Sequence, residues 1–184
     1  AVVTSMLAGW AWHRRALVRA AVPFARFAVA LALWNVGHAA ETMATTLRGK
    51  LIWDGLQMFP FAALGPLVLA VASTHARRPL PWRWLGGFAL LLGACATMVA
   101  TAPWHGRLRN DARLEPPWGT LVYEFSAPDA LAAFLVYLAC FVAAGLVLRQ
   151  LAGDPRRYAG QNLTLAFALA FPPLLLAVAM AIGL

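Results

Sequence analysis

Charged side chains are scarce in this chain of 184 residues. Only 12% of the residues are Asp, Glu, Lys or Arg, whereas 62% are hydrophobic. A soluble domain needs a larger share of polar groups, because water must solvate the surface that covers its core. The composition therefore excludes a soluble globule and predicts an integral membrane protein whose main partner is the lipid bilayer.

Acidic residues are the rarer charged group, with seven against fifteen basic residues, which gives a net charge of +8. In a soluble domain this excess would favour nucleic acid as a partner. Here the basic residues are spread over short segments between apolar runs and form no continuous basic face. We therefore expect no nucleic-acid binding, and we interpret the basic residues as determinants of membrane orientation.

Residue types that serve covalent or metal chemistry are also few. The two cysteines, Cys95 and Cys140, both fall within apolar runs, where cysteine behaves as a small hydrophobe, so we expect neither a disulfide nor a metal site. The sequence contains no His-Glu-x-x-His run, no Ser-x-x-Lys run and no paired carboxylates deep in a span. We expect neither enzyme activity nor a resident cofactor in this chain.

Long apolar runs are abundant, and a transmembrane helix needs about 20 mostly apolar residues. The runs predict six spans, near residues 1–12, 20–42, 51–74, 82–102, 128–148 and 160–184. Twelve residues reach only about 18 Å as a helix, so we expect the first span to begin upstream of Ala1. Neither a linker nor an internal repeat divides the chain. The sequence thus predicts one all-α domain, residues 1–184, folded as a polytopic transmembrane helix bundle.

Basic residues are shared unequally between the two sides of this predicted bundle. The segments that follow the first, third and fifth spans, together with Arg26 and Arg83 just inside the next spans, hold ten basic residues and one acid, Asp154, whereas the other side holds five basic residues and six acids. Positive charge is retained on the cytoplasmic side. We therefore expect a location in the bacterial inner membrane with the N-terminus outside. Leu184 then also lies outside, and we expect a seventh span beyond it.

Polar residues interrupt the apolar pattern where the second and third spans approach the outer side. Three of them recur every three residues on one helix face, and two more are three apart on the next span. Adjacent antiparallel helices joined by roughly eight residues bring two such faces together. With a histidine from the outer loop, residues 103–127, the candidate ligand-binding or signalling residues of this outward-facing pocket are Asn35, His38, Glu41, Asp54, Gln57 and His105.

Other interpretations of these residues stay open. Polar groups in membrane bundles often only hydrogen-bond between helices, each contributing about 1 kcal/mol. His38 and His105 lie on the same predicted side and are the residues through which a haem, a pigment or a metal would bind, although two histidines alone are a loose pattern. A transporter would show paired broken helices or repeated halves, whereas here only Pro172-Pro173 interrupts a span, without a counterpart.

The order of several residues along the chain is informative. Trp34 and Glu41 lie seven residues apart, and Pro66 follows the run Lys50-Leu51-Ile52-Trp53. The order continues with Thr101, His105, Trp118-Gly119, Arg157-Tyr158, Gln161 and Pro172. Over about residues 15–184 the chain resembles the amino-terminal seven-transmembrane sensor region of bacterial histidine kinases. In that family the outer loop usually opens with a Thr-Asn pair, where this chain has Thr101-Ala102-Pro103.

The resemblance implies a sensor that passes a signal to a cytoplasmic output domain such as a kinase. The chain itself shows neither a phosphoacceptor helix nor a nucleotide-binding lobe, so the module is expected to be non-catalytic. The ligands of the family are mostly undefined, and the resemblance names none. The alternative is an accessory subunit docked in the membrane to a larger complex, for example one that contains pigment or haem. Other membrane subunits or a second copy of the chain are the expected protein partners.

Overall fold

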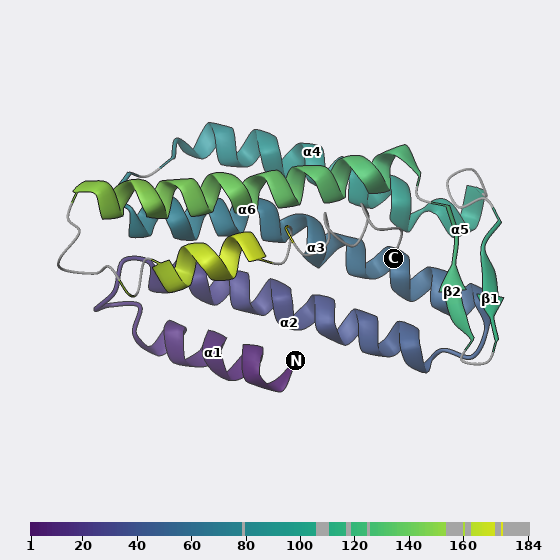
Figure 1. Cartoon of the computed structure of the whole chain (residues 1–184). Helices are drawn as coiled ribbons and strands as arrows, with labels where there is room; N and C mark the ends of the chain where they lie inside the picture. The colour runs from purple at the N-terminus through teal and green to yellow at the C-terminus, as the bar shows by residue number, and fades with distance from the viewer. Residues whose placement is uncertain are drawn as a thin grey trace.

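The computed structural model describes residues 1–78, 80–105, 111–116, 119–124, 126–153, 160, 163–171 and 174 (Figure 1). The described elements are α1 (Val2–His13), α2 (Ala21–Met43), α3 (Leu47–His75), α4 (Trp82–Ala100), α5 (Ala102–His105), β1 (Arg113–Glu115), β2 (Thr120–Val122) and α6 (Ala127–Gly153). Residues 163–171 are also helical. The prediction of an all-α helix bundle is confirmed.

Three of the described helical segments are long and apolar enough to cross a membrane, namely Leu47–His75, Trp82–Trp104 and Ala127–Gln150. The helix α2 has 23 residues, which corresponds to about 34 Å. Its mean hydropathy is lowered by Arg26 and by the polar residues near its C-terminal end. The apolar helices support a membrane location, while the exact number of six spans stays a prediction.

The helix α3 lies at the centre of the bundle and packs against α2, α4 and α6. Small side chains make these contacts close: Ala62 of α3 shares a buried cluster with Ala30 of α2, Ala96 of α4 and Ala132 of α6. Close packing of small residues is typical of membrane helices, because the surrounding lipid is as apolar as the side chains and van der Waals contact must hold the helices together.

Two glycines allow the closest approaches of α3 to its neighbours. A Cβ atom added at Gly37 of α2 would lie 2.8 Å from the Cβ atom of Gln57, and one added at Gly55 of α3 would lie 3.0 Å from the Cα atom of Ala100. Any larger residue at these points would force the helices apart. Both contacts lie near the same end of the bundle, so α2, α3 and α4 are held in a tight arrangement there.

The two ends of the bundle differ in composition (Figure 1). The hairpin end holds the turn between α2 and α3, the short helix α5, and the antiparallel strands β1 and β2, in which Leu114 pairs with Leu121. The arginine end holds the turn between α1 and α2, the turn between α3 and α4, and the end of α6. Its described basic residues are Arg14, Arg15, Arg19, Arg77, Arg78, Arg83 and Arg149.

The hairpin end departs from the sequence-based expectation in two details. The helix α3 begins at Leu47, so only residues 44–46 join it to α2, instead of roughly eight. The cause is an N-cap, since the Thr46 hydroxyl accepts a hydrogen bond of 3.1 Å from the Gly49 N–H. The second departure is the antiparallel pair β1 and β2, which no sequence pattern predicts, because three-residue strands are too short for a readable alternation.

Candidate functional site

The site at the hairpin end begins with Lys50, the single lysine of the chain. It lies in the first turn of α3 and only 5% of its surface is exposed. Its ammonium group donates hydrogen bonds to the backbone carbonyls of Glu41, at 3.0 Å, and Thr42, at 3.4 Å. These carbonyls belong to the last turn of α2, where the helix dipole is negative and few intrahelical donors remain; the Glu41 carbonyl also accepts from the Ala44 N–H, at 3.2 Å. Lys50 therefore ties the end of α2 to the start of α3.

Gln57 connects two carboxylates that come from different helices. Its side-chain amide donates to Oε2 of Glu41 on α2, at 2.9 Å, and to Oδ1 of Asp54 on α3, at 3.0 Å. Both Asp54 and Gln57 are buried, with 8% and 7% of their surfaces exposed. The two amide hydrogens of Gln57 are thus used by the two carboxylates, which fixes the side chains on one face of the α2–α3 contact.

Tyr123 connects the β-hairpin to these side chains. It follows β2 directly, and its hydroxyl donates a hydrogen bond of 3.1 Å to Oδ2 of Asp54. The residues are 69 positions apart in the sequence, and β2 packs against α3. We call the side chains that connect α2, α3 and the β-hairpin the polar network; they are His38, Glu41, Lys50, Asp54, Gln57 and Tyr123.

The candidate residues from the sequence do not all join this network. His38 lies at its edge, with Nδ1 3.4 Å from Oε2 of Glu41 and a side chain that is 69% exposed. Asn35 instead donates to the carbonyl of Leu31 in its own helix, at 2.8 Å. The backbone of His105 ends α5, but its side chain lies outside the described residues. The haem or pigment interpretation through His38 and His105 stays a prediction.

The chemistry available in the network is that of charge and hydrogen bonding. Two carboxylates and one ammonium group lie in or beside a region of low dielectric, where each charge interacts more strongly than in water. The Oε1 atom of Gln57 is buried and accepts no hydrogen bond in the structure. Among the described residues no group of three or more His, Cys, Asp or Glu side chains has the geometry of a metal site. The network suits a proton or a hydrogen-bond donor.

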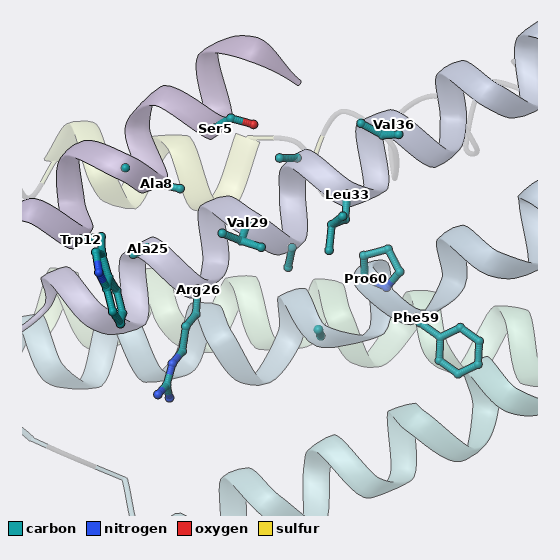
Figure 2. Close-up of a pocket in the computed structure, with 14 residues that line it drawn as sticks. Ser5, Ala8, Trp12, Ala25, Arg26, Val29, Leu33, Val36, Phe59 and Pro60 are labelled. Atoms are coloured by element: carbon teal, nitrogen blue, oxygen red, sulfur yellow. The ribbon is translucent and has the colours of Figure 1, made fainter.

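A groove of about 870 Å³ lies elsewhere, along α1, α2 and α3 (Figure 2). Figure 2 shows Trp12 and Arg26 at one end of it and Val36 and Phe59 at the other. Apart from Ser5 and the Arg26 guanidinium, the lining side chains are apolar or small. Such a surface matches lipid chains or another apolar helix, so polar recognition is better served by the network.

Comparison with protein families identifies the family of this chain. A family model described as the N-terminal seven-transmembrane region of histidine kinase matches residues 1–184. The chain belongs to that family. Neither a curated protein nor a solved structure matches it significantly. This histidine-kinase seven-transmembrane region is a membrane sensor module, and such regions are non-catalytic in their family, which agrees with the helix bundle.

Sequence reasoning found four members of the network and missed the roles of two. Lys50 enters the sequence analysis only in the run Lys50-Leu51-Ile52-Trp53, and its burial is not predicted, since a lysine near a predicted helix end normally reaches water. Its uniqueness in the chain is the available signal. Tyr123 is not among the candidate residues, because aromatic residues in loops between spans are commonly found at the lipid headgroups. No local pattern links it to Asp54.

Proposed function

We propose that this histidine-kinase seven-transmembrane region detects a stimulus at the polar network and converts it into a change in the packing of α2 against α3. The observation that carries the proposal is the hydrogen-bonded series from Glu41 through Gln57 and Asp54 to Tyr123. It joins two helices and the β-hairpin through buried charged groups. A change in the charge or hydrogen bonding of one member alters the contacts of the others.

The site faces the exterior in this proposal. In the sequence, the segments that follow the first, third and fifth predicted spans, together with Arg26 and Arg83, hold ten basic residues and one acid, so the positive-inside tendency supports a cytoplasmic position for the arginine end in an inner membrane. The hairpin end and the N-terminus are then on the outer side. His38 is the member of the network that meets solvent most, and histidine is the residue type that most often serves as a pH switch in proteins. Acidification is therefore the first stimulus to test.

The route of the signal follows α3, which passes from one end of the bundle to the other. Pro60 and Pro66 lie inside this helix, beginning three residues after Gln57. Each proline lacks the N–H that would bond to the preceding turn, which weakens the helix locally and favours bending. A rearrangement at Gln57 is transmitted most easily as a change in bend at these positions. It reaches the arginine end, where we propose that a histidine kinase output domain responds.

The experiment measures autophosphorylation of the full-length gene product in sealed membrane vesicles whose outer-side pH is varied from 5 to 8. The double variant His38→Ala/Glu41→Ala should change the output or its pH dependence by at least about threefold while membrane insertion stays normal. The matched control is Arg48→Ala, an exposed charge in the first turn of α3. It should behave like the wild type, because Arg48 is outside the network.

Normal signalling by the double variant at every pH would reject the network as the sensory site. The accessory-subunit interpretation predicts other results. In that case the protein would co-purify stably with defined membrane partners after mild detergent extraction, and substitution of Glu41 would change the amount of partner retained without changing phosphorylation. The two readouts thus separate a sensor from a docked subunit.

A further inference from the structure

A second site lies at the arginine end, independent of the polar network. It is a cavity of about 420 Å³ between the turn that joins α1 to α2, the C-terminal end of α3 and the end of α6. The residues that line it are Leu17, Val18, Arg19, Ala20, Thr74, His75, Arg77 and Gln150. Three segments that are distant in the sequence therefore border the same cavity at this end of the bundle.

The lining of the cavity contains basic residues and favours an anion. Arg19, Arg77 and His75 are among its lining residues, and no Asp or Glu occurs among the described residues that form its wall. The lining therefore suits a ligand with an anionic oxygen.

Arg77 is placed in the cavity at a conformational cost. Its φ angle is 54°, in the left-handed region that favours glycine. It is the second residue after α3 and follows the C-cap Ala76; the Arg78 N–H bonds to the Ser73 carbonyl at 2.8 Å and the Arg77 N–H bonds to the Thr74 carbonyl at 3.2 Å. This is the Schellman arrangement, in which glycine is the usual residue. An arginine at this position makes the fold less stable than a glycine would, and it places a basic side chain at the cavity.

An apolar cavity of about 250 Å³ continues from the basic one. The two share Val18, Ala20 and His75 in their linings. Beyond these, the second cavity is lined by hydrophobic side chains together with Arg14: Trp10, Ala11, Ala21, Phe24, Val71 and Leu165. A basic compartment joined to an apolar one has the chemistry of an amphiphile with an anionic headgroup.

We propose that these joined cavities bind one anionic phospholipid, with its phosphodiester group at Arg19 and Arg77 and part of an acyl chain against Trp10 and Phe24. Basic pockets between transmembrane helices at the cytoplasmic surface are a recurring way of binding anionic lipid headgroups. The bound lipid joins the α1–α2 turn to the ends of α3 and α6. Lipid composition thereby sets how firmly these three segments are held together.

The test uses the purified chain in nanodiscs of phosphatidylcholine with or without phosphatidylglycerol, and native mass spectrometry counts the phosphatidylglycerol that remains bound. Each lost guanidinium should weaken this binding about tenfold, so Arg19→Ala/Arg77→Ala should bind on the order of 100-fold more weakly. The matched control is Arg78→Ala/Arg83→Ala. It removes the same charge from the same end, but neither residue lines the cavity, and its binding should stay within about threefold of wild type.

Two further variants separate binding from folding. Arg77→Gly should bind phosphatidylglycerol about tenfold more weakly and yet unfold at a higher temperature, because glycine suits the left-handed backbone. Ala20→Phe fills the junction between the cavities and should exclude the lipid while both arginines remain. Equal loss of binding in the two double variants would overturn the proposal in favour of general surface attraction. Displacement of the lipid by millimolar inorganic phosphate would overturn it in favour of a free-phosphate site.

Discussion

The hairpin end and the arginine end of the bundle hold their charges in opposite ways. At the hairpin end, Lys50, Asp54 and Gln57 are more than nine-tenths buried. Gln57 donates a hydrogen bond to Asp54, and Lys50 donates to the backbone carbonyl of Glu41. At the arginine end, Arg19 and Arg77 are exposed and border an open cavity. Arg14 and Arg15 lie over tryptophan rings, at 5.9 and 4.9 Å from the ring centroids.

This difference shows how one bundle can have a rigid end and an adaptable one. Burial of a charge is costly unless hydrogen bonds and an opposite charge compensate it, so the network at the hairpin end tolerates few arrangements. An exchange of partners changes the free energy of an exposed arginine little, because water solvates its side chain in every arrangement. We therefore assign specific detection to the hairpin end and adjustable contact with lipid to the arginine end.

The largest expected effect comes from removing the buried ammonium. Lys50→Ala should lower the free energy of unfolding by about 3 kcal/mol, because two charge-assisted hydrogen bonds to the end of α2 are lost. Thermal unfolding in detergent micelles measures this effect. Arg48→Ala is the control at the same turn, and it should change stability by less than about 0.5 kcal/mol, since Arg48 is exposed. Similar losses in both variants would contradict the rigid hairpin end.

The contact between α2 and α3 offers the next largest effect. Gly37→Ala should cost about 2 kcal/mol, because its Cβ atom would lie 2.8 Å from that of Gln57 and the helices must separate. Gly93→Ala is the matched control in α4, where an added Cβ meets nothing within 4 Å. It should be neutral or stabilising, as alanine favours a helix. Stability measured by thermal unfolding should therefore move in different directions.

The link between the β-hairpin and the bundle can be tested with a single hydroxyl. Tyr123→Phe removes the bond to Asp54 and should destabilise the attachment of the β-hairpin by about 1.5 kcal/mol, since the acceptor is a carboxylate. Hydrogen exchange of residues 113–122 should become about tenfold faster. Asp54→Asn and the double variant complete a mutant cycle. Additive effects of the two substitutions would show that the hydrogen bond is not the connection.

A substitution at the arginine end should have the opposite sign. Arg77→Gly should raise the free energy of unfolding by about 1 kcal/mol, because it relieves a left-handed backbone that disfavours a side chain. Calorimetry in lipid nanodiscs without anionic lipid isolates this effect from ligand binding. Arg78→Gly is a useful control, because that residue does not have a positive φ angle. A loss of stability in Arg77→Gly would mean that the guanidinium itself holds the fold.

The smallest expected effect concerns the exposed edge of the network. His38→Ala should change stability by no more than about 0.5 kcal/mol, because the ion pair with Glu41 is largely solvated. The ion pair needs a protonated imidazole, which acid favours, so unfolding is compared at pH 5 and at pH 8. Unfolding curves at the two pH values should therefore differ slightly more in the wild type than in the variant. A larger effect at pH 8 than at pH 5 would contradict the ion pair.

Much of the fold was predictable from local pattern. Long apolar runs located the helices to within a few residues, and the three-residue spacing of Glu41 and His38, and of Asp54 and Gln57, placed each pair on one helix face. The same spacing also placed Asn35 on this face, but its side chain bonds within its own helix and not to the network. An Asn side chain can satisfy itself on the carbonyl four residues earlier, as it does at Leu31, and sequence spacing does not reveal that choice.

The sequence by itself determined the membrane environment, the helical class and the asymmetric distribution of arginine, because hydropathy, helical period and charge are properties of short segments. Only the tertiary structure decided that Lys50 is buried, that Tyr123 meets Asp54 and that Arg19 and Arg77 border one cavity. Burial and contact depend on which helices pack side by side and how closely they approach. That approach is set by small residues such as Gly37, whose neighbour across the interface is 20 positions away in the chain.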